Sequence, residues 1–153
     1  MKKLILLLIS ILSSNVYSIE VKLQSSTNST YTYSNGTIER GKGNSIILVK
    51  DNGDNKSIHI TSDIAEVDRN MTISPNQTYG TSNSSYRDIS DNNKWEIQNT
   101  DYNNNTISDV SIKIDRNTGQ FFLTRRFTNP GGNVTRTNAS GLCEKIDTSK
   151  KKF

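Results

Sequence analysis

Residues 94–128 read KWEIQNTDYNNNTISDVSIKIDRNTGQFFLTRRFT, and this stretch decides the fold. Apolar and polar side chains alternate in three of its segments, which is typical of β-strands that bury one face. The turn between the second and third segments begins with Asp115 and ends with Gly119, as a type I turn with a glycine bulge does. Strands joined by such short turns predict an antiparallel meander. The three segments are KWEIQN (94–99), SDVSIKID (108–115) and QFFLTRRFT (120–128).

The same pattern continues on both sides of this stretch. After the turn NPGGN (129–133) the chain enters a fourth strand of the meander. Upstream, Asn35 and Gly36 separate two extended runs, and we expect a type I′ hairpin there because both residues tolerate a positive φ. A further hairpin is expected around 51–56. We therefore predict an all-β fold, an antiparallel meander that forms a small sandwich or an open barrel.

Two segments depart from the strand pattern. SDIAEVD (62–68) is expected to form a short helix capped by Ser62 or Asp63. Residues 69–93 consist almost wholly of Asn, Ser, Thr, Asp, Gly and Tyr, with MTIS the only strand-like piece. So polar a segment cannot bury enough apolar area to offset its ordering entropy, and we predict a long polar surface loop there.

The first 18 residues have the order of a secretory signal peptide. Two lysines precede an apolar run from Leu4 to Leu12, and small residues follow before Ser18. We expect cleavage after Ser18, which would place the mature protein in the periplasm or outside the cell. The apolar run is far shorter than the ~20 residues of a membrane-spanning helix, so no membrane span is expected.

Length and charge limit what the mature chain is expected to do. Removing 18 of the 153 residues leaves 135, enough for a single β domain at 19–148 followed by a basic tail at 149–153. The net charge falls from +4 to +2 because Lys2 and Lys3 are removed. So small a charge argues against nucleic acid as a partner. The tail is expected to be solvated.

Few residues could carry nucleophilic chemistry. Cys143 is the only cysteine and His59 the only histidine. A catalytic thiol needs a nearby base, but His59 is expected on the polar face of a strand, where a solvated histidine explains it. One cysteine and one histidine also do not supply the usual zinc ligands. The sequence therefore predicts no catalytic residues, no metal ligands and no cofactor.

Oxygen-rich segments could in principle bind calcium. Asp101, Asn103 and Asn105 match the first, third and fifth positions of a helical calcium loop. Thr106 stands where that loop needs glycine, and Ile112 stands where it needs a bidentate glutamate. Hairpin turns explain such segments better.

Arg125 is an exception to the alternating pattern in QFFLTRRFT. If Phe121, Leu123 and Phe127 face inward, alternation sends Arg125 inward too. An unpaired buried charge is costly, so a bulge or an edge strand is the favoured explanation. An arginine paired with a carboxylate, or one that binds a ligand, is the alternative.

Two further features are candidates for interaction. Tyr31 and Tyr33 share one side of a predicted strand and could form part of a face that binds a sugar or a peptide, although core packing explains them equally well. Cys143 has no partner within the chain. It is therefore free and buried, or it bonds to another molecule and forms a disulfide-linked dimer or complex. Disulfides persist outside the cytoplasm, which allows the second alternative.

From Trp95 onward the order W, SIKIDRNTGQFF, GG, SGLCEKI resembles the C-terminal part of a loose group of small uncharacterised exported bacterial proteins. In that group a tryptophan strand precedes an Ile-x-Ile-x-Arg-x-Thr-Gly-x-Phe hairpin and a closing Gly-x-Cys. The resemblance covers about a third of the chain. Members often have a second cysteine near the tryptophan, whereas Glu96, Ile97 and Gln98 follow it here. The resemblance thus implies that Cys143 is the remnant of a lost disulfide.

These observations favour an exported envelope or secreted protein that acts as a non-catalytic binding module. Its partner would be a protein or a glycan. A small inhibitor that inserts the 69–93 loop into a host or competitor enzyme is one alternative. A hydrolase built from scattered carboxylates is another.

Overall fold

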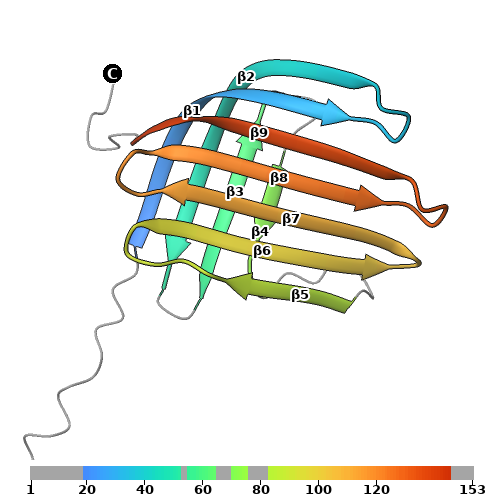
Figure 1. Ribbon diagram of the computed structural model, residues 1–153. Coiled ribbons are helices and arrows are strands. Elements are labelled where there is room, and N and C mark those ends of the chain that lie inside the picture. Colours follow the sequence, from blue (N-terminus) through green and yellow to red (C-terminus); the bar gives the residue numbers. More distant parts are fainter. Residues whose placement is uncertain (1–18, 53–54, 65–69, 76–82, 146–153) are drawn as a thin grey trace, which may run out of the picture.

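The described residues form a single curved β-sheet of nine antiparallel strands (Figure 1). The computed structural model describes residues 19–52, 55–64, 70–75 and 83–145, and no helix occurs within them. The strands are β1 (Ile19–Thr32), β2 (Ile38–Asp51), β3 (Lys56–Ser62), β4 (Asn70–Ile73), β5 (Asn83–Asp88), β6 (Lys94–Asn103), β7 (Thr106–Asp115), β8 (Gln120–Thr128) and β9 (Val134–Lys145).

The strand order makes this sheet a nearly closed barrel. Its order is β4-β3-β2-β1-β9-β8-β7-β6-β5, so every strand pairs with its neighbours in sequence except β4 and β5, which do not pair with each other, and β1 also pairs with β9. β4 and β5 form the two edges, and the barrel has its seam between them. The predicted all-β meander and open barrel are therefore confirmed. Figure 1 shows β5–β9 side by side, with β3 and β4 crossing behind them and β1 and β2 bending from one layer to the other.

Alternation along the strands sends one set of apolar side chains into the barrel. Cross-strand register aligns them in rungs, one of which runs from Ile97 through Ile112 and Leu123 to Ala139. Each of these four side chains is buried. The larger buried apolar side chains are Leu23, Ile47, Val49, Ile58, Ile60, Ile64, Ile73, Trp95, Ile97, Ile112, Ile114, Phe121 and Leu123.

Small side chains line the interior where β1 and β2 bend. Thr27 Oγ1 donates to Ser45 Oγ (3.0 Å), which donates to Ser62 Oγ (3.1 Å), so a buried chain of hydroxyl groups crosses three strands. This pairing removes most of the cost of burying polar groups. Gly141 of β9 lies so close to β1 that a Cβ atom there would overlap Ser25 Oγ. Strands that bend sharply need such small residues on the inside of the curve.

Side chains bridge the seam where no backbone pairing exists. Lys56 Nζ of β3 lies 2.7 Å from Asp88 Oδ2 of β5, and Asp51 Oδ1 lies 4.0 Å from the same ammonium group. Tyr86 of β5 donates from its hydroxyl group to the backbone oxygen of Lys56 at 2.8 Å. These contacts join the two ends of the sheet.

The hairpin turns differ in detail from the predictions. Gly36 has a φ of 85° and donates to Tyr33 O at 3.0 Å, but Asn35 does not have positive φ, so the predicted type I′ turn is wrong. A type I turn closed by a left-handed glycine forms instead. The two-residue type I′ geometry occurs between β6 and β7, where Asn104 and Asn105 have φ of 45° and 63°. Asparagine tolerates this region better than most residues. The weak calcium match at 101–112 therefore covers a hairpin.

Residues 69–93 contain two strands where one loop is predicted. β4 pairs with β3, and β5 pairs with β6. β5 has the sequence NSSYRD, which lacks an apolar alternation, so its backbone hydrogen bonds to β6 and the half-buried Tyr86 hold it in place. The predicted helix at 62–68 begins within β3, which extends to Ser62; residues 65–69 lie outside the described part of the chain.

Candidate functional site

Tyr31 and Tyr33 contact each other at the end of β1. Their rings meet edge to face, with centroids 4.6 Å apart and an interplanar angle of 71°. Tyr33 donates from its hydroxyl group to Glu39 Oε2 at 2.9 Å. Tyr31 is half-buried, on the same side of the strand as the buried Ser29. The pair therefore packs against itself and the neighbouring strand at one hairpin.

Arg125 lies on the inner face of β8, half-buried between Val110 of β7 and Thr137 of β9. β8 is an interior strand, and its pairing with β7 continues in unbroken register from Phe121 to Thr128. The favoured explanation by a bulge or an edge strand is therefore wrong. The barrel interior is polar at this end, where Asn99 and Thr137 are buried.

Cys143 points into the core of the barrel. It is 9% exposed, and burial raises the pKa of its thiol to about 11, partly offset by a hydrogen bond with Ser25. A buried, protonated thiol reacts poorly, because the thiolate is the nucleophile. A disulfide-linked dimer through Cys143 therefore has no support in this geometry.

His59 lies on the outer face of β3, away from Cys143. Its Nδ1 atom is 2.7 Å from Thr72 Oγ1 and its Nε2 atom is 3.2 Å from Thr61 Oγ1. The two threonines hold the ring, and the sheet separates it from the thiol, so the two groups do not form a catalytic pair. In the described ranges, no group of three or more His, Cys, Asp or Glu side chains could hold a metal ion. The same residues include no helix long and apolar enough to cross a membrane.

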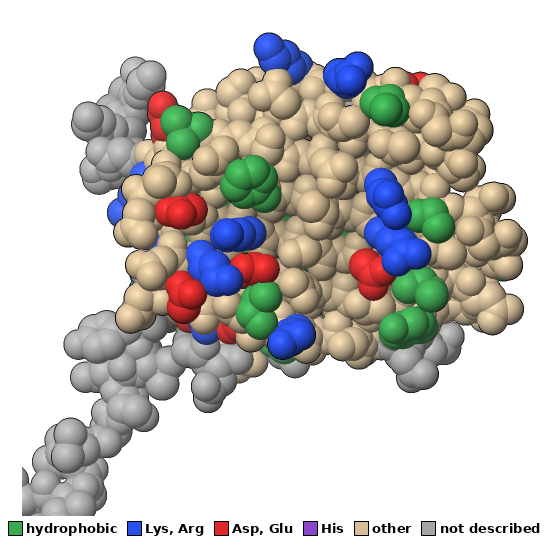
Figure 2. All heavy atoms as spheres, viewed as in Figure 1, with side chains coloured by type: hydrophobic (Ala, Val, Ile, Leu, Met, Phe, Trp, Pro, Cys, Tyr) green, Lys and Arg blue, Asp and Glu red, His purple; other side chains and the backbone are tan. Residues whose placement is uncertain are grey.

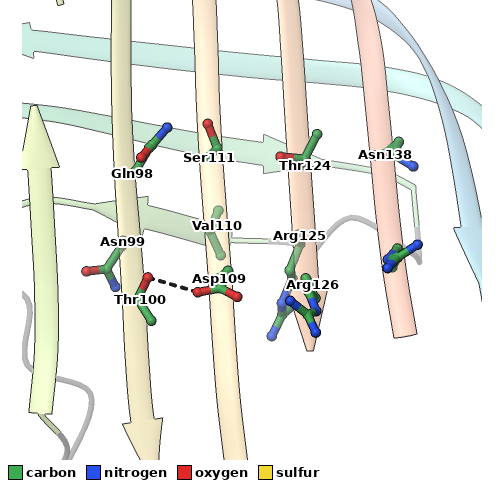
Figure 3. Close-up of a pocket in the computed structure, with 11 residues that line it drawn as sticks. Gln98, Asn99, Thr100, Asp109, Val110, Ser111, Thr124, Arg125, Arg126 and Asn138 are labelled. Carbon is green, nitrogen blue, oxygen red and sulfur yellow. Dashed lines mark hydrogen bonds between the residues drawn. The ribbon is translucent and has the colours of Figure 1, made fainter. Parts of the chain in front are cut away.

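A shallow groove of about 420 Å³ lies on the outer face of β6–β9. Its volume is within the range of small-ligand sites. Two adjacent rows of outward-facing side chains cross the four strands here, as Figure 3 shows for the labelled residues. The uncharged row is Gln98, Ser111, Thr124 and Asn138; the charged row is Thr100, Asp109, Arg126 and Arg136.

The charged row places two arginines directly opposite each other on neighbouring strands. Arg126 pairs in register with Arg136 on one side and with Asp109 on the other. Asp109 Oδ1 accepts a hydrogen bond from Thr100 Oγ1 at 2.9 Å. No ion pair or hydrogen bond joins either guanidinium group to another residue of the described chain. Like charges directly opposite each other destabilise a sheet, so folding stability does not explain this pair.

An exposed aromatic side chain flanks the groove on each side. Phe122 of β8 is 43% exposed and lies two residues before Thr124, whereas Tyr102 of β6 is 50% exposed and lies two residues after Thr100. By alternation both rings lie on the outer face with the two rows. Figure 2 shows charged and hydrophobic side chains gathered in two groups on this face, with a broad band of other side chains between them.

The groove has the chemistry of a binding site. Its arginines can donate to an anion, and its amide and hydroxyl groups can donate to or accept from a polar ligand. Comparisons of this chain with protein-family models, with curated proteins and with solved structures found no match.

The sequence alone did not identify this groove. Alternation could have assigned Arg126, Thr124 and Gln98 to one face of their strands. The strand order and register that bring Arg136 beside Arg126 depend on the packing of the whole sheet. Of the predicted interaction residues only Arg125 contributes to the groove lining.

Proposed function

We propose that this chain is an exported, non-catalytic binding protein whose ligand site is the groove over β6–β9, and that the ligand carries negative charge. The signal-like order of residues 1–18 supports export to the periplasm or beyond the cell. The single observation that carries the proposal is the pair Arg126 and Arg136, which lie directly opposite each other on an exposed surface and form no ion pair within the described chain.

The lining of the groove favours binding over catalysis. It contains no cysteine or histidine, and its one carboxylate, Asp109, is held by Thr100. Catalysis needs an activated nucleophile, a metal or an acid–base pair, and binding needs only placed donors and acceptors. The inhibitor alternative depended on one long loop at 69–93; β4 and β5 occupy part of that segment, and residues 76–82 lie outside the described chain.

The test is binding of the mature chain, residues 19–153, to immobilised anionic polymers of different chemistry. Polygalacturonate, dextran sulfate and polyglutamate serve as probes in surface plasmon resonance at physiological salt. We expect at least one of them to bind, and the double variant Arg126→Ala/Arg136→Ala to reduce that binding roughly 10-fold or more.

A matched control separates the groove from general charge. Arg40 and Lys42 are exposed on β2, two strands beyond the edge of the groove. Their double alanine variant removes the same two positive charges, and we expect it to bind like the unchanged chain. An equal loss in both variants, or no binding of any anionic polymer, would overturn the proposal.

A further inference from the structure

We infer that the ligand of this groove is an oligosaccharide that carries carboxylate groups, of the uronic acid type. This inference rests on the function proposed above and specifies its ligand. Three properties of the outer face of β6–β9 lead to it: the net charge of one row, the uncharged donors and acceptors of the next, and the exposed aromatic ring beyond them.

The charged row matches one negative charge. Arg126 and Arg136 supply two positive charges, and Asp109, in register beside Arg126, supplies one negative charge. The row thus has one net positive charge, which a singly charged group neutralises. A phosphate dianion would lie close to the carboxylate of Asp109 and be repelled by it. A planar carboxylate also suits the paired N–H groups of a guanidinium group.

The uncharged row matches sugar hydroxyl groups. Gln98 and Asn138 each offer a carbonyl oxygen and an NH₂ group, and Ser111 and Thr124 each offer a hydroxyl group. None of these four side chains forms a hydrogen bond with another residue of the described structure. Their donors and acceptors are therefore directed at solvent in the free protein. A ligand with many hydroxyl groups can replace that water without leaving polar groups unpaired.

Phe122 provides an apolar platform beside this row. Its ring is 43% exposed, and the side chains directly opposite it on the two neighbouring strands are polar. The C–H face of a sugar ring can cover the Phe122 ring and remove apolar area from water. Phe122 lies four residues before Arg126 on β8, a separation of about 13 Å along the strand. One sugar ring over Phe122 with a carboxylate at Arg126 therefore requires a ligand of more than one sugar unit.

The sheet geometry disfavours an acidic peptide. β6, β7, β8 and β9 each pair with a strand on both sides, so their backbone groups are already used in the sheet. An extended peptide cannot add to them as a further strand, which is the usual source of its affinity and register. It would have to rely on side-chain contacts alone.

Isothermal titration with defined oligomers tests the inference. The ligands are a trimer of galacturonic acid, the same trimer with its carboxylates reduced to alcohols, a sulfated neutral trisaccharide and a hexapeptide of glutamate. We expect the galacturonate trimer to bind, and the reduced trimer to bind at least roughly 10-fold more weakly because it lacks the charge-assisted hydrogen bonds. The sulfated sugar and the peptide should also bind more weakly than the uronate.

Variants then locate the contacts. Arg126→Ala and Arg136→Ala should each weaken trimer binding roughly 10-fold. Phe122→Ala should weaken binding of the trimer while the response to polyglutamate stays unchanged, and Arg40→Ala should change neither. These side chains are exposed, and fluorescence of Trp95 confirms that each variant is folded.

The outcomes separate this inference from the proposed function. Equal affinity for the galacturonate trimer and its reduced form, or tighter binding of the glutamate peptide or the sulfated sugar, overturns the inference but leaves an anion-binding groove. Absence of binding to every anionic probe overturns both.

Discussion

The bridge across the seam gives the sharpest stability prediction, and Asp88→Asn is the perturbation. The pair Lys56 and Asp88 joins β3 to β5 at 2.7 Å, and their side chains are 20% and 22% exposed. Because β4 and β5 are the unpaired edges of the sheet, this contact substitutes for the backbone ladder that is absent there. Removing the charge of Asp88 should therefore lower the free energy of unfolding while leaving the strands themselves intact.

The expected cost at pH 7 is about 1–2 kcal/mol, between the values for exposed and for fully buried ion pairs. Solvent still reaches both groups, and Asp51, 4.0 Å from the Lys56 ammonium group, remains as a partner for it. Both facts reduce the loss. Urea unfolding followed by the fluorescence of Trp95, the only tryptophan and a buried one, measures it. The midpoint of thermal unfolding should fall by roughly 3–6 °C.

The cost should depend on pH in a defined direction. Burial alone would raise the pKa of Asp88, but hydrogen bonds from Lys56 and Ser90 and the lysine charge outweigh it and hold the pKa below the ordinary 3.8. A carboxyl group whose pKa is lower in the folded state stabilises the fold fully above its unfolded pKa. That contribution is lost as the pH falls through the folded pKa. The difference between the unchanged chain and Asp88→Asn should therefore shrink below about pH 4.

An exposed ion pair supplies the control. Lys50 and Glu20 lie 3.3 Å apart with side chains 51% and 61% exposed, and Glu20→Gln should change stability by less than about 0.5 kcal/mol. A cost of Asp88→Asn no larger than that of Glu20→Gln at pH 7 would contradict a stabilising contact across the seam. So would a cost of Asp88→Asn that is as large at pH 2.5 as at pH 7.

Two further predictions concern the core thiol and a turn. Cys143 should resist a thiol reagent at pH 8 in the folded chain, because burial raises its pKa to about 11, and it should react fully in urea. Rapid reaction of the folded chain would contradict this prediction. Asn105→Ala should destabilise the chain by about 1 kcal/mol because Asn105 has a φ of 63°, whereas Asn105→Gly should not destabilise it. Urea unfolding compares the two variants, and equal costs would contradict the turn geometry.

Local pattern was sufficient to predict the strands of the C-terminal half. KWEIQN, SDVSIKID and QFFLTRRFT alternate so regularly that only strands bury their apolar residues on one side. Short turns then fix antiparallel neighbours. The closure of the sheet by β1 and β9 could not be predicted in the same way, because it joins segments more than a hundred residues apart through backbone groups.

β5 shows where local pattern fails. NSSYRD has neither apolar alternation nor a strong strand former apart from Tyr86, so its local pattern predicts a loop. Its ladder with β6 and the Tyr86 hydrogen bond to Lys56 O stabilise it, and both are tertiary contacts. The type I′ turn was misplaced for a related reason. Asn35-Gly36 and Asn104-Asn105 both permit positive φ. The register of the flanking strands decides which of the two pairs has positive φ at both of its residues.

Arg125 and Arg126 show why the proposed binding site could not be identified from sequence. Both are arginines, and they follow each other on β8, so alternation alone sends one side chain inward and the other outward. The sequence singled out Arg125 because an inward charge is unusual. The exposed Arg126 is not unusual in the sequence, since a surface arginine needs no explanation by itself. It becomes informative only when strand register places Arg136 opposite it. Two like charges on directly opposed residues, neither of them in an ion pair within the described chain, destabilise a sheet and support the proposed role in binding.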